Sequence, residues 1–538
     1  MRLVTALLLS LPLLVPAQTP SAPAAGPRRP KLILAITIDQ FRYDYLTRFR
    51  DQYTGGIHRL LNQGAVYTNA YYEHFPTVTA IGHSTYLTGA TPSISGIVGN
   101  EWFDRDAGKQ VTSVTDDQVQ MLGGQARTGS GGSSAASPRR LMVSTVGDEL
   151  KMAGRGSKVV GISVKDRSAI LPAGHMADGA YWFDPNTGNF VSSTFYFPQL
   201  PGWVQDYNKS RLADKWLGQA WTPISGGAAF KTMPKEAGKP YFNLLESTPY
   251  GNDLVASFAL AALAGEQLGK RNTTDVLAVS FSSNDYVGHG VGPDDPQVRD
   301  ISIRTDRVLG DFFKAIDTQI GMRNVLVILT ADHGVAPLPE LSQQRRLPGG
   351  RLDDKVVAAA IEKRLTERYG EGKWIAGKIG ASQYLNLKLI NEKKLNFAEV
   401  QETGAQAVRE IPHIFRVYTR DQLQHGAVPG DALDRRILAG FHQRRSADIN
   451  VIIEPYYLFE AKGTSHGMPF HYDAHVPLIF MGDWIKPGRY NQKAAPNDVA
   501  PTLATLLDVE TPSGAVGRVL TEILQPAGAA PRAARTAP

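Results

Sequence analysis

Seven residues of this chain carry side chains that bind divalent cations, and each follows a strand-like apolar run or lies in a Gly-rich turn. They are Asp39, Thr79, Asp285, His289, Asp332, His333 and His466. Side chains at the carboxyl ends of parallel strands meet in one crevice of an α/β sheet, so these seven are expected to lie together. Three carboxylates, three imidazoles and a hydroxyl suit a pair of Zn²⁺ ions, and two zinc ions beside a threonine can split phosphate esters.

Thr79 is the candidate nucleophile. It follows an extended, Pro-containing segment and opens a helical pattern, where unpaired backbone N–H groups and the helix dipole favour a bound phosphoryl oxygen. A threonine hydroxyl is a weak nucleophile at neutral pH unless a metal holds it as an alkoxide. Thr79 could instead be only a helix cap, and Thr77 is a rival position in the same run.

Two further segments offer ligands at strand ends. Asp39 closes the apolar run 31–38, where it could bind a metal or cap the next helix. Asp285 and His289 follow the run 276–281, and their spacing of four places a carboxylate and an imidazole within reach of one ion. The glycines between 288 and 292 allow the backbone to approach that ion closely.

The third pair is Asp332 and His333, which follow the buried run 325–329. Asp-His-Gly at the end of such a strand favours metal ligation over ordinary salt bridging. His466 lies in the turn Gly-Thr-Ser-His-Gly, with His471 and His475 as competitors downstream. Three other histidines lie near the motifs without a partner of their own, and a supporting or surface position is expected for them: His74, His83 and His175.

Lys165 and Arg167 follow the run 159–164 and are spaced by two. On an extended chain this spacing puts both cations on one face, with Asp166 pointing away. The pair could bind the non-bridging oxygens of a phosphate, although a solvated charged turn is the default for such a tripeptide. Asn100 could donate an amide N–H to another phosphate oxygen.

The alternation of elements predicts the fold class. Apolar runs of strand length alternate with amphipathic helical patterns, which indicates a layered α/β/α sandwich with a largely parallel sheet. The expected strands are 31–38, 159–164, 276–281, 325–329 and 476–480, and the expected helices are 140–152, 252–268, 297–320 and 498–507.

Two regions interrupt this alternation. The segment 178–250 is rich in aromatics, Pro and Gly, and is predicted to be a loop-rich insertion beside the site. The segment 347–455 is predicted to be a small inserted α+β lobe, so the catalytic domain would comprise 31–346 and 456–525. Within the lobe the expected helices are 353–369 and 397–411, and the expected strands are 383–389, 414–418 and 449–453.

The chain ends indicate export. Residues 1–17 have the charged start, apolar run and small-residue cleavage site of a signal peptide, with cleavage expected before Gln18. A disordered lead-in is expected over 18–30 and a disordered tail over 526–538. No apolar stretch after the signal could span a bilayer. With no cysteine, disulfides and thiolate ligands are excluded. A periplasmic or secreted protein is expected.

The net charge of +6 gives no support for nucleic-acid binding. Five arginines lie in the signal, lead-in and tail, namely Arg2, Arg28, Arg29, Arg532 and Arg535, so their removal leaves +1 for the body. A nucleic-acid binder keeps a basic stripe on its fold, and no such run is visible. The expected partners are small-molecule phosphate monoesters, bound by a monomer.

Taken together, these motifs resemble those of the alkaline phosphatase superfamily, and most of all the phosphate-irrepressible alkaline phosphatases of bacteria. The resemblance spans about 31–524. The matching motifs, in order, are Ile38-Asp39, His74-Phe-Pro-Thr-Val-Thr79, Gly99-Asn100, Lys165-x-Arg167, Asp285-x-x-x-His289, Ala331-Asp-His-Gly334 and Gly463-Thr-Ser-His-Gly467.

The resemblance implies a role for each residue. Asp285, His289 and His466 would hold one zinc ion, and Asp39, Asp332, His333 and Thr79 the other. Thr79 would form a phosphothreonine intermediate. Asn100, Lys165 and Arg167 would bind the phosphoryl oxygens, a set that in this family accompanies a preference for monoesters.

The resemblance leaves alternatives. A nucleotide pyrophosphatase or phosphodiesterase on the same scaffold is the first. A metal-stabilised binding protein without turnover is the second, and the complete ligand set with its threonine argues against it. A sulfatase would need a C/S-x-P-x-R motif, which the sequence lacks. A phosphoglycerate mutase relative would be cytosolic and use serine.

Overall fold

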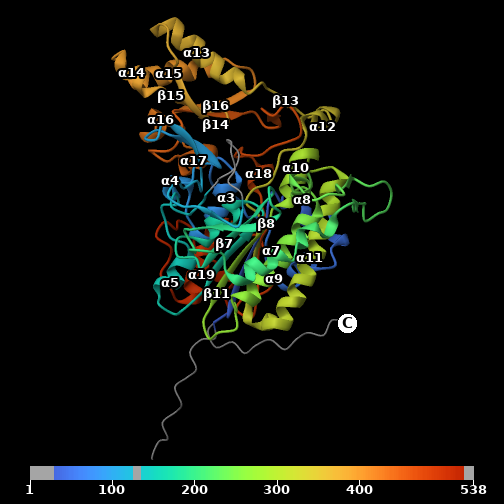
Figure 1. Cartoon of the computed structure of the whole chain (residues 1–538). Helices are drawn as coiled ribbons and strands as arrows, with labels where there is room; N and C mark the ends of the chain where they lie inside the picture. Colours follow the sequence, from blue (N-terminus) through green and yellow to red (C-terminus); the bar gives the residue numbers. More distant parts are fainter. Residues whose placement is uncertain (1–28, 125–134, 526–538) are drawn as a thin grey trace, which may run out of the picture.

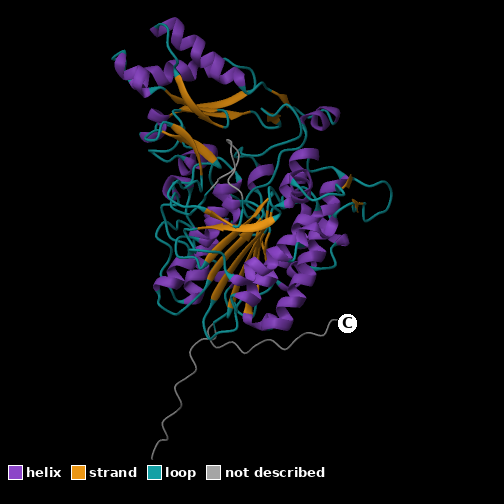
Figure 2. Cartoon of the chain, in the orientation of Figure 1, coloured by secondary structure: helices purple, strands orange, loops and turns teal. Residues whose placement is uncertain are grey.

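A ten-stranded mixed sheet forms the centre of the molecule, with helices on both faces (Figures 1 and 2). The computed structural model describes residues 29–124 and 135–525. The strand order is β20 (Gly488–Tyr490), β2 (Ala65–Tyr67), β19 (Leu478–Met481), β12 (Val325–Thr330), β1 (Leu32–Ile38), β11 (Asp275–Phe281), β6 (Val159–Ser163), β7 (Gly179–Asp184), β8 (Asn189–Ser193) and β5 (Met121–Leu122). The five strands from β12 to β7 are parallel, whereas β19 and β8 run against their neighbours. The predicted α/β class with a largely parallel sheet is confirmed.

The continuous apolar runs are explained by burial on both faces. In β1 the residues Leu32, Leu34 and Ile36 belong to one core, and Ile33 and Ala35 to the other. The first core includes α2 (Gly56–Gln63), α9 (Pro249–Gly265) and α11 (Pro296–Ile320). The second is covered by α3 (Thr79–Thr88), α5 (Val146–Met152) and α19 (Val499–Leu507). Because the strands are covered on both sides, polar side chains emerge only at their ends.

Helix α5 begins later than the predicted 140–152. Its start is fixed by a capping box in which Thr145 accepts from the Asp148 N–H and the Asp148 carboxylate accepts from the Thr145 N–H. This reciprocal cap satisfies the first free backbone donors of the helix, so the helix starts at Val146.

The segment 178–250 contains more regular structure than a loop-rich insertion. Strands β7 and β8 extend the central sheet, β7 running parallel to β6. Their aromatic residues are buried: Phe190 stacks on Phe258 of α9 at 3.8 Å between ring centroids. Helices α7 (Gly202–Lys209) and α8 (Lys239–Glu246) then pack beside α9. Both faces of β7 are buried, so apolar and aromatic residues follow one another without the alternation that marks a half-buried strand.

A four-stranded antiparallel sheet lies above the central sheet in Figure 1. Its order is β14 (Ile375–Ile379), β15 (Ser382–Leu385), β17 (Ile449–Ile453) and β16 (Ile414–Thr419). Helices α13 (Lys355–Tyr369) and α15 (Phe397–Arg409) share a separate hydrophobic core with it. The strand predicted over 383–389 stops at Leu385, since Asn386 caps helix α14 (Leu387–Glu392) by accepting from the Leu389 N–H.

This lobe contacts a hairpin of the main domain, β3 (Glu101–Asp104) and β4 (Lys109–Thr112). The Arg105 guanidinium donates to both oxygens of the buried Asp448, at 2.8 and 3.1 Å. Gly377 of β14 lies against the Phe103 ring, with no space for a Cβ. The hairpin, which begins directly after Asn100, is therefore held against the lobe.

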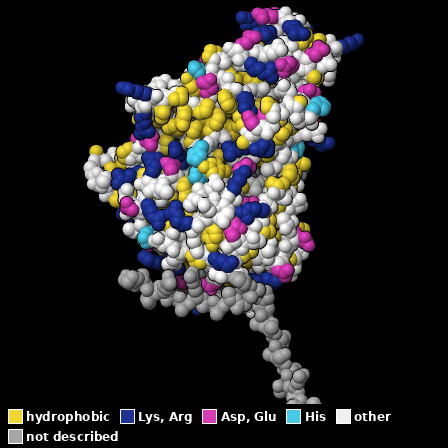
Figure 3. All heavy atoms as spheres, turned by 180° about the vertical axis from the view of Figure 1, so that it is seen from behind, with side chains coloured by type: hydrophobic (Ala, Val, Ile, Leu, Met, Phe, Trp, Pro, Cys, Tyr) yellow, Lys and Arg dark blue, Asp and Glu magenta, His cyan; other side chains and the backbone are white. Residues whose placement is uncertain are grey.

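The remaining expectations concern the termini and the surface. The predicted signal peptide, the tail and most of the 18–30 lead-in lie outside the described residues. The Gly/Ser-rich composition of 123–137 predicts a flexible loop, and most of that segment also lies outside them. Within 29–124 and 135–525, no helix has both the length and the apolarity needed to cross a bilayer. Basic side chains are scattered among acidic and apolar ones on the face in Figure 3.

Candidate metal and phosphate site

The seven predicted ligand residues converge at the carboxyl ends of the central strands. Asp39 follows β1, and Asp332 and His333 follow β12. Asp285 and His289 lie one turn apart on α10 (Ser283–Val291), which follows β11. Thr79 begins α3, and His466 lies in the loop before α18 (His471–Ala474). Ligand atoms of Asp285, His289 and His466 lie within 4.8 Å of one another, and so do those of Asp39, Asp285 and His333.

All three histidines are oriented in the same way. Each donates its Nδ1–H to a backbone carbonyl: His289 to Thr464 at 2.8 Å, His333 to Gly334 at 2.9 Å and His466 to Thr77 at 2.8 Å. This fixes the tautomer of the neutral ring, in which Nε2 is the unprotonated nitrogen, and directs Nε2 toward the carboxylates. Histidine ligands of metals are held in this manner.

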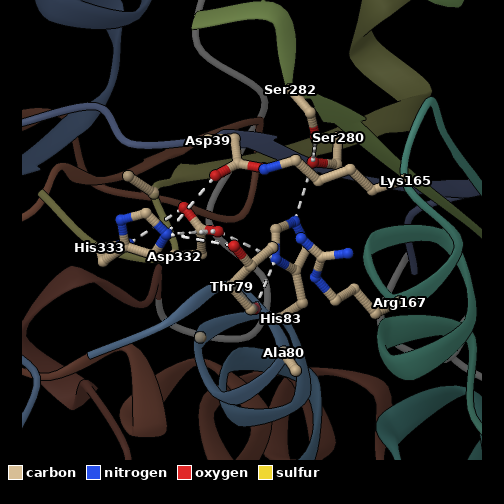
Figure 4. Close-up of polar contacts among 12 residues, drawn as sticks. Asp39, Thr79, Ala80, His83, Lys165, Arg167, Ser280, Ser282, Asp332 and His333 are labelled. Atoms are coloured by element: carbon tan, nitrogen blue, oxygen red, sulfur yellow. Dashed lines mark hydrogen bonds and ion pairs between the residues drawn. The ribbon is translucent and has the colours of Figure 1, made fainter. Parts of the chain in front are cut away.

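The carboxylates supply oxygens that need a positive partner. Asp39 Oδ1 and Asp332 Oδ2 are buried and accept no hydrogen bond. They lie 3.6 and 3.3 Å from His333 Nε2 (Figure 4). Burial and the neighbouring Asp39 charge raise the pKa of Asp332 well above its usual range. A divalent cation would satisfy these oxygens and remove that repulsion, so the donor set fits metal ions bound by O and N ligands.

The other cluster, around Asp285, is already charge-balanced in part. Burial opposes ionisation of Asp285, but His289 and Lys165 hold its pKa well below its usual range. The same carboxylate, against the effect of burial, raises the pKa of His289 to about 9. Burial and the neighbouring His333 lower the pKa of His466, which keeps that imidazole neutral. A neutral imidazole is the form that binds metal.

Lys165 lies between the two carboxylate clusters. Its ammonium donates to Asp39 Oδ2 at 2.7 Å and to Asp285 Oδ2 at 2.6 Å. Despite the cost of burial, these two charges raise its pKa, so the cation persists. An ammonium has three N–H groups, and the two carboxylates use two of them. The Tyr286 ring lies beneath it, 5.0 Å from Nζ to the ring centroid.

The structure separates Thr79 from its rival and from a capping role. Val78 is the N-cap of α3, and Thr79 is the first helical residue. Thr79 Oγ1 lies 3.4 Å from His333 Nε2, at the edge of the carboxylate cluster (Figure 4). Thr77 instead donates its hydroxyl to the Met468 carbonyl at 2.9 Å. Only Thr79 of the two presents its oxygen to the ligands.

Asn100 and Arg167 complete the polar rim. Asn100 Oδ1 accepts a hydrogen bond from the Ala80 N–H at 2.8 Å. The Asn100 NH₂ group does not take part in this bond and can donate to another acceptor. Arg167 lies in the first turn of α6 (Asp166–Ala173) and its Nε has no hydrogen-bond partner. Asp166 was expected to point away, but it lines the same cavity. Strand alternation does not apply there, since the helix begins at Asp166.

Two residues that contact the ligand carboxylates or Thr79 were not predicted as part of the site from the sequence. Gln40, with φ of 60°, donates its N–H to Asp332 at 3.0 Å and its amide to Asp285 at 2.7 Å. His83 is buried, donating to the Thr79 carbonyl at 2.9 Å and contacting Ser280 Oγ at 2.8 Å. Its Nδ1 also lies 3.2 Å from Asp332. The spacing of four between Thr79 and His83 on one helix could have indicated this contact.

The competing histidines lie elsewhere. His475 is stacked between Tyr43 and Tyr71, at 4.2 and 4.3 Å between ring centroids. His471 contacts the Tyr71 hydroxyl at 2.8 Å. The buried His74 packs near Tyr72, and burial lowers its pKa to about 3. None of these three belongs to a metal-ligand group among the described residues.

The sequence and this geometry match known proteins. Residues 33–473 match the family model for type I phosphodiesterase / nucleotide pyrophosphatase. Alkaline phosphatase PafA of Elizabethkingia meningoseptica is 38% identical over 523 residues, covering 92% of this chain and 95% of the relative. This chain belongs to the alkaline phosphatase superfamily, in its PafA-like group.

Two further comparisons support this membership. Alkaline phosphatase PhoV of Synechococcus elongatus is 37% identical over 522 residues, with 92% of this chain and 93% of the relative covered. A crystal structure of a PafA variant with four substitutions superposes with a TM-score of 0.86 and 36% identity, covering 93% of this chain and 99% of the other. The resemblance predicted from the motifs is confirmed.

The approach of α3 to the loop after β12 generates a prediction. A Cβ at Gly82 would overlap the carbonyl and Cα of Asp332. We expect Gly82→Ala to displace the helix that carries Thr79, lowering the free energy of unfolding by about 1–3 kcal/mol and weakening the binding of divalent metal ions. Denaturant unfolding and calorimetric zinc titration measure both. The control is Gly202→Ala, where a Cβ meets no atom within 4 Å. Equal behaviour of the two variants would contradict this packing account.

Proposed function

We propose that this chain is a periplasmic or secreted alkaline phosphatase that hydrolyses phosphate monoesters through a phosphothreonine at Thr79, with two bound Zn²⁺ ions. The activity itself is supported by the PafA and PhoV relatives. The observation that carries the mechanism is the convergence of three oriented histidines and three buried carboxylates in one site, with the Thr79 hydroxyl 3.4 Å from His333 Nε2. When bound, the ions would supply Lewis-acid charge at the reacting oxygens.

The family resemblance supplies the two ligand sets. Asp285, His289 and His466, whose ligand atoms form one group in the structure, would hold one ion. Asp39, Asp332, His333 and the Thr79 oxygen would hold the other, and His333 Nε2 lies within 3.6 Å of the three oxygens. Thr79 lies at the start of α3, so the positive end of the helix dipole also favours the anionic form of its hydroxyl.

Each step then conserves atoms and charge. The Thr79 hydroxyl loses its proton to solvent and its oxygen attacks phosphorus, while the bond from phosphorus to the ester oxygen breaks and the leaving group departs as an alcohol after taking up a proton. Water then attacks the phosphothreonine and loses a proton, the bond from phosphorus to the Thr79 oxygen breaks, and that oxygen takes up a proton as inorganic phosphate leaves. Three phosphoryl oxygens carry the developing charge, and preorganised donors around them stabilise it.

Asn100, Lys165 and Arg167 are the proposed phosphate-binding group. The Asn100 NH₂, the third Lys165 N–H and the Arg167 guanidinium are donors at the same end of one cavity. The superposed PafA variant has one threonine, one asparagine, one lysine and one arginine substituted, the four residue types proposed here. A monoester dianion needs all three donors more than a diester monoanion does.

A nucleotide pyrophosphatase or phosphodiesterase is the second candidate, because the matching family model bears that description. The comparison that separates the two is kcat/KM of the zinc-loaded protein on p-nitrophenyl phosphate and on bis-p-nitrophenyl phosphate. We expect a strong preference for the monoester. EDTA should abolish the activity, and added Zn²⁺ should restore it. A diester preference would move the function to the second candidate, and no turnover with zinc bound would favour a binding protein.

Substitution of both cationic side chains, Lys165 and Arg167, tests the phosphate-binding group. In Lys165→Ala/Arg167→Ala we expect kcat/KM for the monoester to fall by at least 100-fold more than for the diester, since the monoester has the greater charge to compensate. Similar losses on both substrates would refute the proposed role. Arg346→Ala, at an exposed position of the same charge, is the matched control.

Substitution of the nucleophile gives a distinct result. We expect Thr79→Ala to retain both zinc ions, measured by metal analysis, while kcat on p-nitrophenyl phosphate falls by several orders of magnitude. Thr77→Ala should retain far more activity, because its hydroxyl faces the Met468 carbonyl. Near wild-type turnover in Thr79→Ala would instead indicate direct attack by water.

A further inference from the structure

The loops that carry His333 and His466 meet at one short helix, α18. His333 lies in the loop after β12, and His466 lies in the loop that precedes α18. Their rings stack at 3.5 Å between centroids, with 13° between the ring planes. Because the two histidines belong to different proposed ligand sets, the position of one loop relative to the other affects both ion sites.

The loop after β12 is bound to α18 through backbone atoms. The Gly334 N–H donates to the Asp473 carbonyl at 2.7 Å, and the Val335 N–H donates to the Tyr472 carbonyl at 3.0 Å. A Cβ at Gly334 would overlap the Tyr472 carbonyl, so this close approach requires a glycine. The residue directly after His333 is therefore fixed to the backbone of Asp473.

The loop that carries His466 is bound to the same residue, but through its side chain. Asp473 Oδ2 accepts from the N–H groups of Gly467 and Met468, at 3.0 and 2.8 Å. Two successive N–H groups converge on one oxygen only where the chain bends, and Gly467 has a φ of 118°, in the region that favours glycine. Asp473 is fully buried. Removal of its carboxyl group would leave both N–H groups without this acceptor in the interior, which costs free energy.

The chain that follows β12 holds the His466 loop on both sides of the histidine. On the N-terminal side, Ala336 forms two hydrogen bonds, of 3.1 and 2.7 Å, with the two residues that precede His466. On the C-terminal side, Asp473 makes the connection. Thr77, from the segment before α3, contacts that side as well, through its hydroxyl and the Met468 carbonyl at 2.9 Å. Asp473 thus joins the C-terminal side of the His466 loop to the loop after β12.

We infer that Asp473 is a positioning residue that places the His466 imidazole for metal binding. It acts through the backbone of the two residues after His466, and it belongs to no group of candidate ligands among the described residues. Loss of its carboxyl oxygen should therefore weaken the ion held by Asp285, His289 and His466 more than the ion of the other ligand set. The inference rests on the proposed two-metal site and adds a residue to it.

Two substitutions of similar size separate this role from simple packing. Asp473→Leu removes the acceptor, whereas Asp473→Asn retains an oxygen that can accept both bonds. Competitive titration of Zn²⁺ against a chromophoric chelator gives the two dissociation constants. In Asp473→Leu we expect one of them to rise by about 10–100-fold, as is usual when a contact that orients a ligand is lost, and the other to change by less than about threefold. In Asp473→Asn both should stay within about threefold of the wild-type values.

The inference would be overturned by unchanged dissociation constants in Asp473→Leu, or by an equal rise in both. The route of the effect is checked in a His466→Ala background, where Asp473→Leu should cause almost no further loss of affinity for Zn²⁺. A second loss of the same size in that background would show that Asp473 does not act through His466.

Asp498→Leu is the matched control. Asp498 is also buried and accepts from two backbone N–H groups, those of Ala495 and Arg518 at 2.9 and 2.8 Å, but it belongs to no group of candidate ligands among the described residues. This variant should lower the unfolding temperature and leave both dissociation constants for Zn²⁺ unchanged. Equal weakening of metal binding in Asp498→Leu and Asp473→Leu would assign both effects to general destabilisation and overturn the inference.

A measurement on the wild-type protein does not depend on the folding of any variant. In the metal-free protein, hydrogen exchange followed by mass spectrometry should show protected amides at Gly467 and Met468, because their acceptor is a side chain of the protein rather than the ion. Rapid exchange of both amides until Zn²⁺ is added would overturn the inference. Two bound ions with equal behaviour of all variants would refute the role of Asp473 alone, whereas failure of the wild-type protein to bind any divalent metal would refute the proposed two-metal site as well.

Discussion

The structure depends on one electrostatic constraint: three carboxylates, Asp39, Asp285 and Asp332, lie close together with almost no contact with water. One ammonium, Lys165, reaches two of them, and the third is left with a raised pKa. Such a cluster is costly to bury unless further positive charge is added. Divalent cations would supply that charge, and relief of the repulsion among the carboxylates would then contribute to the free energy of metal binding.

The fold can keep this arrangement because its ligands come from rigid elements. Asp39 and Asp332 follow adjacent parallel strands, and Asp285 follows the strand on the other side of β1. The carboxyl ends of these strands lie at one edge, so their spacing is set by backbone hydrogen bonds rather than by side chains. Gly82 then allows α3, with Thr79 at its start, to contact the Asp332 backbone. Thr79 and the carboxylates are thus positioned by separate, well-packed elements.

The sequence was sufficient for the features that depend on local pattern. Continuous apolar runs predicted the central strands, and polar residues at their ends predicted which side chains converge. The sequence pattern was insufficient where contacts with residues distant in the chain decide the local conformation. Strand β7 was missed because both of its faces are buried among aromatics, and the role of Gln40 depends on a left-handed backbone at a non-glycine residue. The contacts of Lys165 with Asp39 and Asp285 span more than 100 residues of chain, and no local spacing encodes them.

The lobe connects two properties of the site that could otherwise vary independently. It holds the hairpin that follows Asn100, through Arg105 and the buried Asp448, and it also forms an apolar wall, which includes Leu423 and Phe441, of the cavity that Asn100 lines. A change in loop length or orientation of the lobe would therefore move Asn100 together with the apolar wall of the cavity. Substitution of single side chains on the wall would not. Replacements of wall side chains such as Phe441 and Leu423 would alter the shape of the cavity, while the contact between Arg105 and Asp448 would stay in place.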